Sequence, residues 1–110
     1  MSVESLPIGL GRHAHGSQKA AAQGFFAAEA TFARHGVKIG HYAGHQIGVA
    51  VNEAPRLVPY DDTIVEVGMV FSLEPGAYEG EGGEAGSRME KSIIIGPSGN
   101  ELLCDFPWGF

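Results

Sequence analysis

The chain contains a single cysteine, Cys104, so no disulfide can form within it. The leucines next to Cys104 predict a buried packing residue rather than a nucleophile. No apolar run approaches the roughly 20 residues that span a bilayer, and no basic segment followed by an apolar stretch is present near residue 1. We therefore expect a cytoplasmic protein without a membrane span.

Basic residues are also scarce: 7 Lys and Arg are outnumbered by 13 Asp and Glu, giving a formal net charge of −6. With no Lys/Arg cluster to offset it, this charge opposes binding to nucleic acid or to an anionic membrane and favours cations. Apolar residues make up 44% of the 110 residues, as in a globular domain. A domain this small buries less of its surface than a larger one, which predicts marginal stability.

The pattern of apolar residues predicts an α+β unit. A helix is expected from Ser17 to about His35, with Ser17 as its cap and Gly36 at its end. The apolar surface of this helix is expected to comprise Phe25, Phe26, Ala28, Ala30 and Phe32.

Three strands are predicted, over residues 69–73, 92–95 and 101–104, the second buried on both faces and the third after a turn at 97–100. The segment through Pro55 and Pro59 is expected to be a loop. One helix and several antiparallel strands give the α+β class.

Three side chains stand at the ends of short apolar runs, where separate strands could bring them together on a metal ion: His45, Glu74 and Glu90. Each has an ordinary structural explanation when taken alone. A histidine beside glycines can belong to a turn, Glu74 can simply end a strand before Pro75, and Glu90 can pair with Arg88 in solvent. It is the combination that predicts a site.

The motifs that carry this combination are His41-x-x-x-His45 with Ile47-Gly48, residues 53–59 (EAPRLVP), Glu74-Pro75-Gly76, and residues 87–91 (SRMEK). From about Gly16 onward, the chain resembles the superfamily of methionine aminopeptidase, Xaa-Pro aminopeptidase, prolidase and creatinase. The proline-specific branch is the most similar. The resemblance implies part of a pita-bread fold, with an antiparallel curved sheet and a packed helix.

The resemblance also implies a role for each matching residue. His45, Glu74 and Glu90 would be three of five protein ligands of a two-metal centre holding manganese, cobalt, zinc or iron. Glu74 would also take the proton of the attacking water, and His41 would hold the substrate. Arg88 would orient a ligand carboxylate, unless it forms only a surface ion pair.

Two departures from the family pattern stand out. The family's other two ligands are aspartates upstream of the helix, and no aspartate occurs before residue 41. We therefore expect residues 17–110 to be the C-terminal half of a catalytic domain, after a 16-residue extension or truncated strand, and to be inactive alone. In addition, Asn52 stands where these peptidases usually have histidine; it can bind substrate by a hydrogen bond but cannot act as an acid or base.

The remaining candidates have simpler explanations. Asp61 and Asp62 are expected in a turn, because successive side chains point apart in extended backbone. His13 and His15 are expected in an exposed loop. The acidic, glycine-rich segment 79–86 predicts a loop over the site with glutamates facing solvent. Phe106, Trp108 and Phe110 could pack onto the sheet or contact another subunit, and core packing is the expectation.

Three functions remain open. The first is an Xaa-Pro peptidase that removes the N-terminal residue before a proline. The second keeps the fold but acts on a small non-peptide substrate, as creatinase-like hydrolases or lyases do. The third is a non-catalytic module that binds a peptide or protein. We expect a peptide or small-molecule substrate, no nucleic acid, and either a homo-oligomer or a missing N-terminal half as partner, because apolar surface left uncovered favours association.

Overall fold

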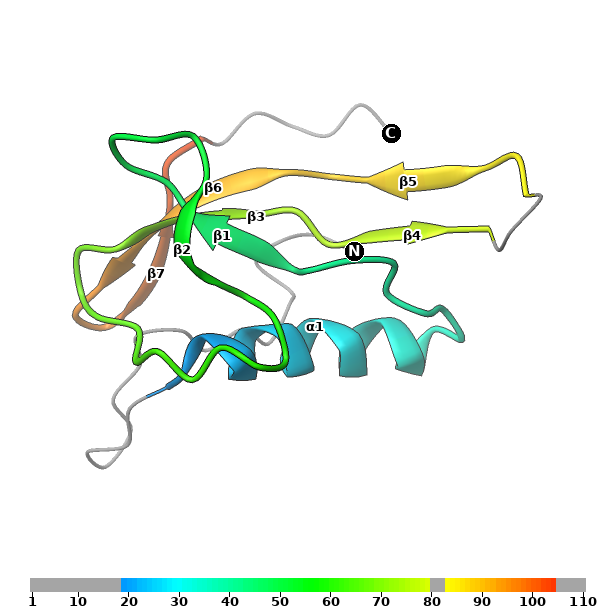
Figure 1. Cartoon of the computed structure of the whole chain (residues 1–110), viewed down its shortest axis with the longest axis horizontal. Helices are drawn as coiled ribbons and strands as arrows, with labels where there is room; N and C mark the ends of the chain where they lie inside the picture. Colours follow the sequence, from blue (N-terminus) through cyan, green and yellow to red (C-terminus); the bar gives the residue numbers. More distant parts are fainter. Residues whose placement is uncertain (1–18, 80–82, 105–110) are drawn as a thin grey trace.

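The computed structural model describes residues 19–79 and 83–104. No helix in these residues is long and apolar enough to cross a bilayer. The predictions for His13, His15 and Ser17, and those for the aromatic residues after 105, fall outside the described ranges. Figure 1 shows a helix beneath strands; in chain order these elements are α1 (Ala21–Arg34), β1 (Gly44–Gln46), β2 (Glu53–Arg56), β3 (Val70–Leu73), β4 (Gly76–Tyr78), β5 (Gly86–Arg88), β6 (Lys91–Gly96) and β7 (Gly99–Leu102).

Helix α1 begins at Ala21, four residues later than predicted. Its N-cap is Ala20, whose N–H donates to Gln23 Oε1 at 2.7 Å. The side chain that caps the start of the helix is therefore a glutamine in the first turn instead of the predicted serine. At the other end the prediction is confirmed. Gly36 has a φ of 71°, its N–H donates to the Ala33 carbonyl, and the Val37 N–H donates to the Phe32 carbonyl. This pair of bonds ends the helix in a Schellman motif.

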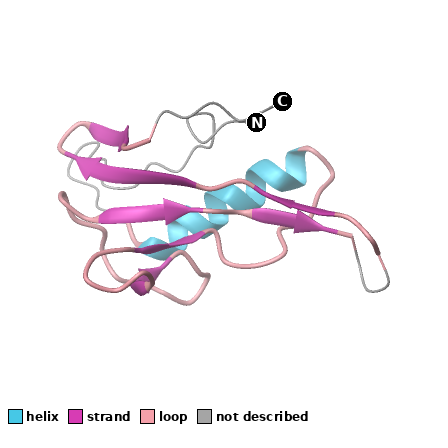
Figure 2. Cartoon of the chain, turned by 90° about the horizontal axis from the view of Figure 1, so that it is seen from above, coloured by secondary structure: helices cyan, strands magenta, loops and turns pink. Residues whose placement is uncertain are grey.

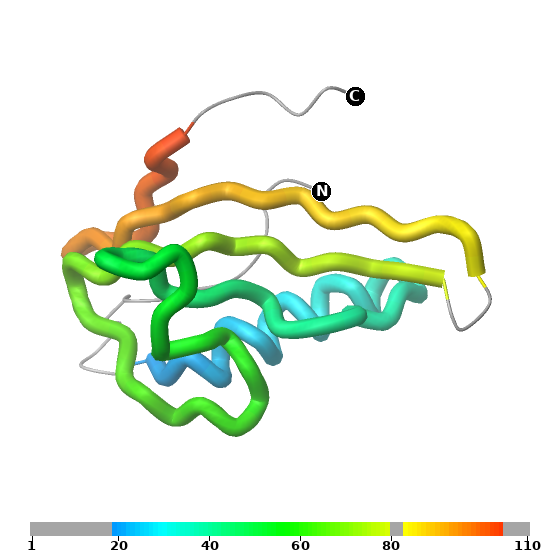
Figure 3. The backbone as a smooth tube through the Cα atoms, turned by 45° about the horizontal axis from the view of Figure 1, so that its top comes forward, coloured from blue at the N-terminus to red at the C-terminus, as the bar shows by residue number. Residues whose placement is uncertain are grey.

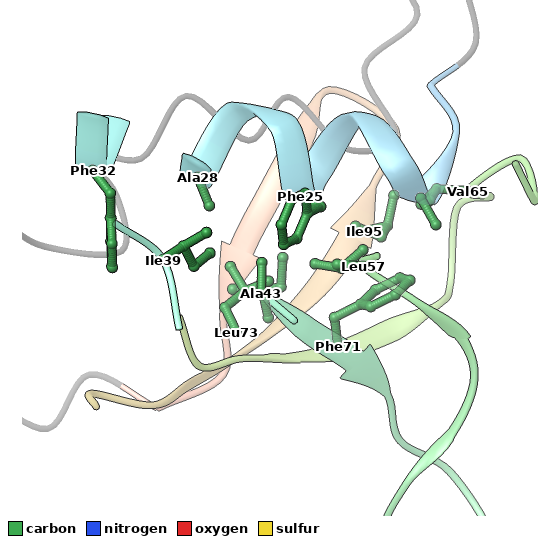
Figure 4. Close-up of a cluster of buried hydrophobic side chains, with 12 residues drawn as sticks. Phe25, Ala28, Phe32, Ile39, Ala43, Leu57, Val65, Phe71, Leu73 and Ile95 are labelled. Atoms are coloured by element: carbon green, nitrogen blue, oxygen red, sulfur yellow. The ribbon is translucent and has the colours of Figure 1, made fainter. Parts of the chain in front are cut away.

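One face of α1 packs on the sheet through Phe25, Ala28 and Phe32 (Figure 4). These residues are three and four positions apart, the spacing of a single helix face. The prediction that Phe26 and Ala30 share this face is wrong: Phe26 is 48% exposed and Ala30 is also exposed. Each step along a helix turns the side chain by about 100°, which carries positions 26 and 30 away from the face that contains positions 25, 28 and 32.

The main sheet is antiparallel, with strand order β2-β1-β3-β6-β7. Seen from above, α1 lies across one face of the strands (Figure 2). Between them is the core, which includes Phe71, Leu73, Ile93 and Ile95. Ile94 is only partly buried, so β6 is fully buried on one face and the prediction of burial on both is wrong. A helix covers only one face of this sheet, which leaves the other face for polar side chains.

Two other boundaries also differ from the predictions. Residues 53–56 form strand β2 instead of a loop; β2 is an edge strand, where a proline costs no ladder hydrogen bond on the open side. Strand β7 covers Gly99–Leu102 instead of residues 101–104, because the turn needs only residues 97 and 98 and Gly96 pairs with Gly99. Cys104 therefore lies beyond the strand and is exposed, and its predicted burial is wrong.

Two long arms of chain run side by side along the molecule, as Figure 3 shows. One contains β3 followed by β4, and the other contains β5 followed by β6; β3 pairs with β6 and β4 pairs with β5. Both arms leave the strand conformation at the same level, at residues 74–75 and at residues 89–90. Leu73 pairs with Lys91 before this break and Gly76 pairs with Arg88 after it. The register continues unshifted, which sets Glu74 opposite Glu90.

Candidate metal and substrate site

A row of polar residues crosses the sheet. His45 pairs with Arg56 on one side and with Ser72 on the other, and Ser72 pairs with Ser92. Paired residues of an antiparallel sheet point to the same face. Because Phe71 and Leu73, the neighbours of Ser72, belong to the core under α1, the row lies on the opposite face. The side chain two residues after Ser72, Glu74, joins this face.

Three of the residues predicted as a site lie at this point of the sheet. His45 Nε2 is 3.6 Å from Glu74 Oε2. The Ser72 hydroxyl is 3.1 Å from Glu74 Oε2 and 2.6 Å from Glu90 Oε1, so it connects the two carboxylates. A hydroxyl carries one hydrogen and donates to one carboxylate at a time, and the shorter contact favours Glu90. Ser72, His45 and Glu74 are 2%, 5% and 6% exposed.

The orientation of the His45 ring follows from its backbone contact. Nδ1 is 3.0 Å from the Gln46 carbonyl oxygen, which can only accept, so Nδ1 carries the hydrogen. In the neutral ring Nε2 is then the unprotonated nitrogen, and it faces Glu74. An Nδ1–H bound to a backbone carbonyl is the usual support for a histidine whose Nε2 binds a metal ion.

His41 lies at the more open side of the same region. Its Nδ1 is 2.7 Å from the Tyr42 carbonyl oxygen, so by the same reasoning Nδ1 carries the hydrogen and Nε2 accepts from the Tyr78 hydroxyl at 2.8 Å. The two rings are 5.4 Å apart. His41 is thereby held by a β4 residue that no spacing in the sequence identified.

Tyr42 connects the buried and exposed parts of the site. Its ring stacks on His45, with centroids 5.8 Å apart and planes 19° from parallel. Burial raises the pKa of Tyr42, as do the nearby Glu74 carboxylate and a hydrogen bond with it, while Asn52 and Arg88 act in the lowering direction. Asn52 Nδ2 donates to the Tyr42 hydroxyl at 3.4 Å, and Arg56 Nε donates to Asn52 Oδ1 at 3.1 Å.

Arg88 lies on β5 with an exposed side chain, opposite Gly76. In the part of the chain that the structure describes, it forms no ion pair with Glu74 or Glu90. The positive charge of Arg88 acts instead to lower the pKa of Tyr42, against the larger raising effects. That Arg88 orients a ligand carboxylate stays a prediction.

Predictions about three loop carboxylates are confirmed. Asp61 is a turn residue: its Oδ2 accepts the Arg56 N–H and its Oδ1 accepts the Thr63 N–H, both at 3.0 Å. Glu79 and Glu84 are exposed in the β4–β5 connection, where Glu79 Oε2 accepts the Glu84 N–H at 2.8 Å.

The types of donor present suit a divalent cation. The His45 imidazole lies beside Glu74, and the carboxylates of Glu74 and Glu90 share the Ser72 hydroxyl. Two carboxylates at one point also concentrate negative charge that a cation would offset. Within the described residues, however, no three His, Cys, Asp or Glu side chains form a group that could hold a metal ion. The arrangement supplies a His45–Glu74 pair and, through Ser72, the nearby Glu90.

Three residues of the site were missed by the sequence analysis: Tyr42, Ser72 and Tyr78. Ser72 had a signal, since it stands two positions before Glu74 in a strand and must share its face. Tyr42 and Tyr78 had none, because their contacts depend on how β1 and β4 meet.

Comparison with known proteins agrees with this geometry. The model of metallopeptidase family M24 matches residues 14–97. The chain is 39% identical to the Xaa-Pro dipeptidase of Pyrococcus horikoshii over 69 residues, which are 63% of this chain and 19% of that protein. The chain spans about a fifth of the length of the curated relatives it matches.

Solved structures give the same result. The dipeptidase PepE from Mycobacterium ulcerans aligns with a TM-score of 0.79 and 30% identity, over 93% of this chain and 26% of that one. The X-Pro aminopeptidase from Thermotoga maritima aligns with a TM-score of 0.78 and 27% identity, over 93% of this chain and 27% of that one. The predicted fold is confirmed: the sheet and its packed helix are part of a pita-bread fold. The chain belongs to metallopeptidase family M24.

Proposed function

We propose that this chain supplies part of the active site of a metal-dependent hydrolase that cleaves the N-terminal residue from peptides with proline in the second position. The observation that carries the proposal is the meeting of His45, Glu74 and Glu90 around Ser72 in a member of family M24. The names of its relatives supply the substrate class, since they include Xaa-Pro dipeptidases and an X-Pro aminopeptidase.

The proposed ligands are His45 through Nε2 and the carboxylates of Glu74 and Glu90. Divalent ions bound there would polarise the scissile carbonyl and acidify a water molecule. Glu74 takes the proton from the attacking water, for which its position beside His45 and Ser72 suits it. His41, oriented by Tyr42 and Tyr78, holds the substrate.

Further donors are needed to complete a two-ion site, because no aspartate precedes residue 41 and the described residues form no three-ligand group. We therefore propose that the 110-residue chain alone shows no useful turnover. Cleavage of an Xaa-Pro dipeptide by the purified chain, at a rate lost on His45→Ala substitution, would contradict this part of the proposal.

The experiment that tests the ligand assignment is the binding stoichiometry of manganese and cobalt, measured by calorimetry. We expect weak binding at one site, lost in both His45→Ala and Glu90→Ala. His35→Ala is the matched control, because His35 is a histidine whose exposed side chain lies at the C-cap of α1. Binding unchanged in both site variants would overturn the assignment.

A second function is favoured by Asn52. Its amide cannot transfer a proton, and it is already bonded to Tyr42 and Arg56. A creatinase-like hydrolase or lyase acting on a small non-peptide substrate is therefore the alternative. A panel of Xaa-Pro peptides and small amidino or sulfonium compounds, tested with a longer protein that contains this sequence, would decide between the two.

A further inference from the structure

We propose that Tyr42 is a positioning residue that holds His45 in place beside Glu74, and that Asn52 and Arg56 act on the site through it. This inference rests on the proposed function in taking His45 and Glu74 as ligands. Tyr42 and Arg56 thereby gain a role in the site, and the role of Asn52 changes.

The first step is the contact of Tyr42 with both ligands. Its ring lies nearly parallel to the His45 imidazole, which restricts rotation of that ring about its bond to Cβ. The Glu74 carboxylate lies near enough to the phenol to contribute to the raised pKa of Tyr42, after burial as the largest cause. One side chain thereby fixes the plane of the His45 imidazole on β1 and lies beside the Glu74 carboxylate that follows β3.

The second step is what holds Tyr42. The Asn52 amide donates to the phenol oxygen. Asn52 is oriented in turn by Arg56 Nε on its carbonyl oxygen, so its two ends cannot exchange without losing both bonds. The backbone of Arg56 is fixed by Asp61 Oδ2. A chain of hydrogen-bonded residues therefore runs from the 61–63 turn through Arg56 of strand β2 and Asn52 to the Tyr42 hydroxyl.

The third step concerns Asn52 itself. With a bond at each end of its amide, its geometry is set by Tyr42 and Arg56, so its effect on a ligand or substrate passes through Tyr42. Outer contacts of this type typically change metal affinity or activity by 10- to 100-fold when removed. We assign Asn52 as a positioning residue, in place of the substrate-binding role expected from the sequence.

Two substitutions separate the parts of this chain. Tyr42→Phe keeps the ring over His45 and removes the hydroxyl. Asn52→Asp keeps an oxygen for Arg56 but replaces the donor to the phenol by an acceptor. Tyr60→Phe is the matched control, since Tyr60 is 86% exposed and has the same change of one hydroxyl.

The first readout is the manganese dissociation constant, together with the double variant. We expect Tyr42→Phe and Asn52→Asp each to weaken binding by about 10-fold or more, with no further loss in the double variant, because Asn52 acts through the phenol. Tyr60→Phe should match the original chain. Additive losses, or a Tyr42→Phe variant that binds as tightly as Tyr60→Phe, would overturn the proposal.

The second readout needs no metal and separates this inference from the proposed function. In the metal-free chain, NMR resonances of the His45 ring carbons and nitrogens report its stacking on Tyr42 and its Nδ1–H form. We expect Asn52→Asp to shift them and Tyr60→Phe to leave them unchanged. If the chain binds no metal but these shifts occur, the ligand assignment fails and the Tyr42 linkage stands; unchanged His45 resonances would disprove the linkage.

Discussion

Successive residues of strand β3 point to its two faces, one of which packs in the core and the other of which carries polar residues of the candidate site. Phe71 and Leu73 point into the core under α1, where side chains from the helix, from strands β3 and β6 and from the connecting segments pack together (Figure 4). Ser72, between them, points to the other face and connects Glu74 with Glu90. One face is held by apolar burial and the other by a few directed hydrogen bonds. The comparison shows that the site depends on a rigid strand whose stability comes from its far side.

The largest effect should come from the apolar face. Phe71 is fully buried, so Phe71→Ala removes its packing and leaves a cavity, and we expect the free energy of unfolding to fall by about 3–5 kcal/mol. Urea denaturation followed by circular dichroism measures this loss. The control is Val49→Ala in the exposed β1–β2 connection, which should change stability by less than about 0.5 kcal/mol. An equal fall in the free energy of unfolding in both variants would show that Phe71 is not part of a packed core under α1.

A smaller effect is expected from the polar face. Ser72→Ala removes the hydroxyl that the buried Glu74 and its neighbour Glu90 share, and an acceptor left without its donor costs about 1–3 kcal/mol. Ser87→Ala, on exposed strand β5, is the control. If Ser72→Ala costs as little as Ser87→Ala in the same urea titrations, the carboxylates do not depend on this hydroxyl, and the contrast between the two faces fails.

Much of the polar face could be anticipated because it is local in sequence. Glu74 and Glu90 end or precede strands that apolar runs identify, and His45 is marked by the glycines and the isoleucine around it. The residues that connect these groups could not be found in the same way. Tyr42 reaches Asn52 across the β1–β2 connection, a contact that depends on the strand pairing rather than on any repeat.

The wrong predictions about the fold also arise from contacts between residues that are distant in sequence. Proline composition predicted a loop where β2 forms, because the sequence does not reveal that β2 lies at the sheet edge. Leucines next to Cys104 predicted burial, but β7 ends at Leu102 and the cysteine lies beyond it. The β2 strand and the exposure of Cys104 both depend on the position of a strand in the sheet, which is set by pairing with strands that are distant in sequence. The end of the helix was predicted correctly because a glycine with positive φ, here Gly36, terminates a helix through local backbone geometry alone.

The smallest effect should come from Asp61, a carboxylate bound outside both faces. Burial acts to raise the pKa of Asp61, but hydrogen bonds from Thr63 and from the Arg56 backbone outweigh it, so the pKa is lowered on folding. A lowered folded pKa means that the stabilisation is present above the unfolded value and is lost as pH falls through the folded value. Asp61→Asn should therefore lower stability by about 1 kcal/mol at neutral pH, a difference that shrinks below about pH 4.

Thermal unfolding of both proteins between pH 2 and pH 7 measures this difference, with Asp62→Asn as the control at the neighbouring exposed aspartate. A gap between Asp61→Asn and the original chain that stays constant down to pH 2 would contradict the lowered pKa. Because Asp61 also fixes the backbone of Arg56, the same variant tests whether the turn influences the polar face. The His45 resonances should shift in Asp61→Asn and not in Asp62→Asn, since Asp61 starts the hydrogen-bonded chain that ends at Tyr42, whose ring stacks on His45.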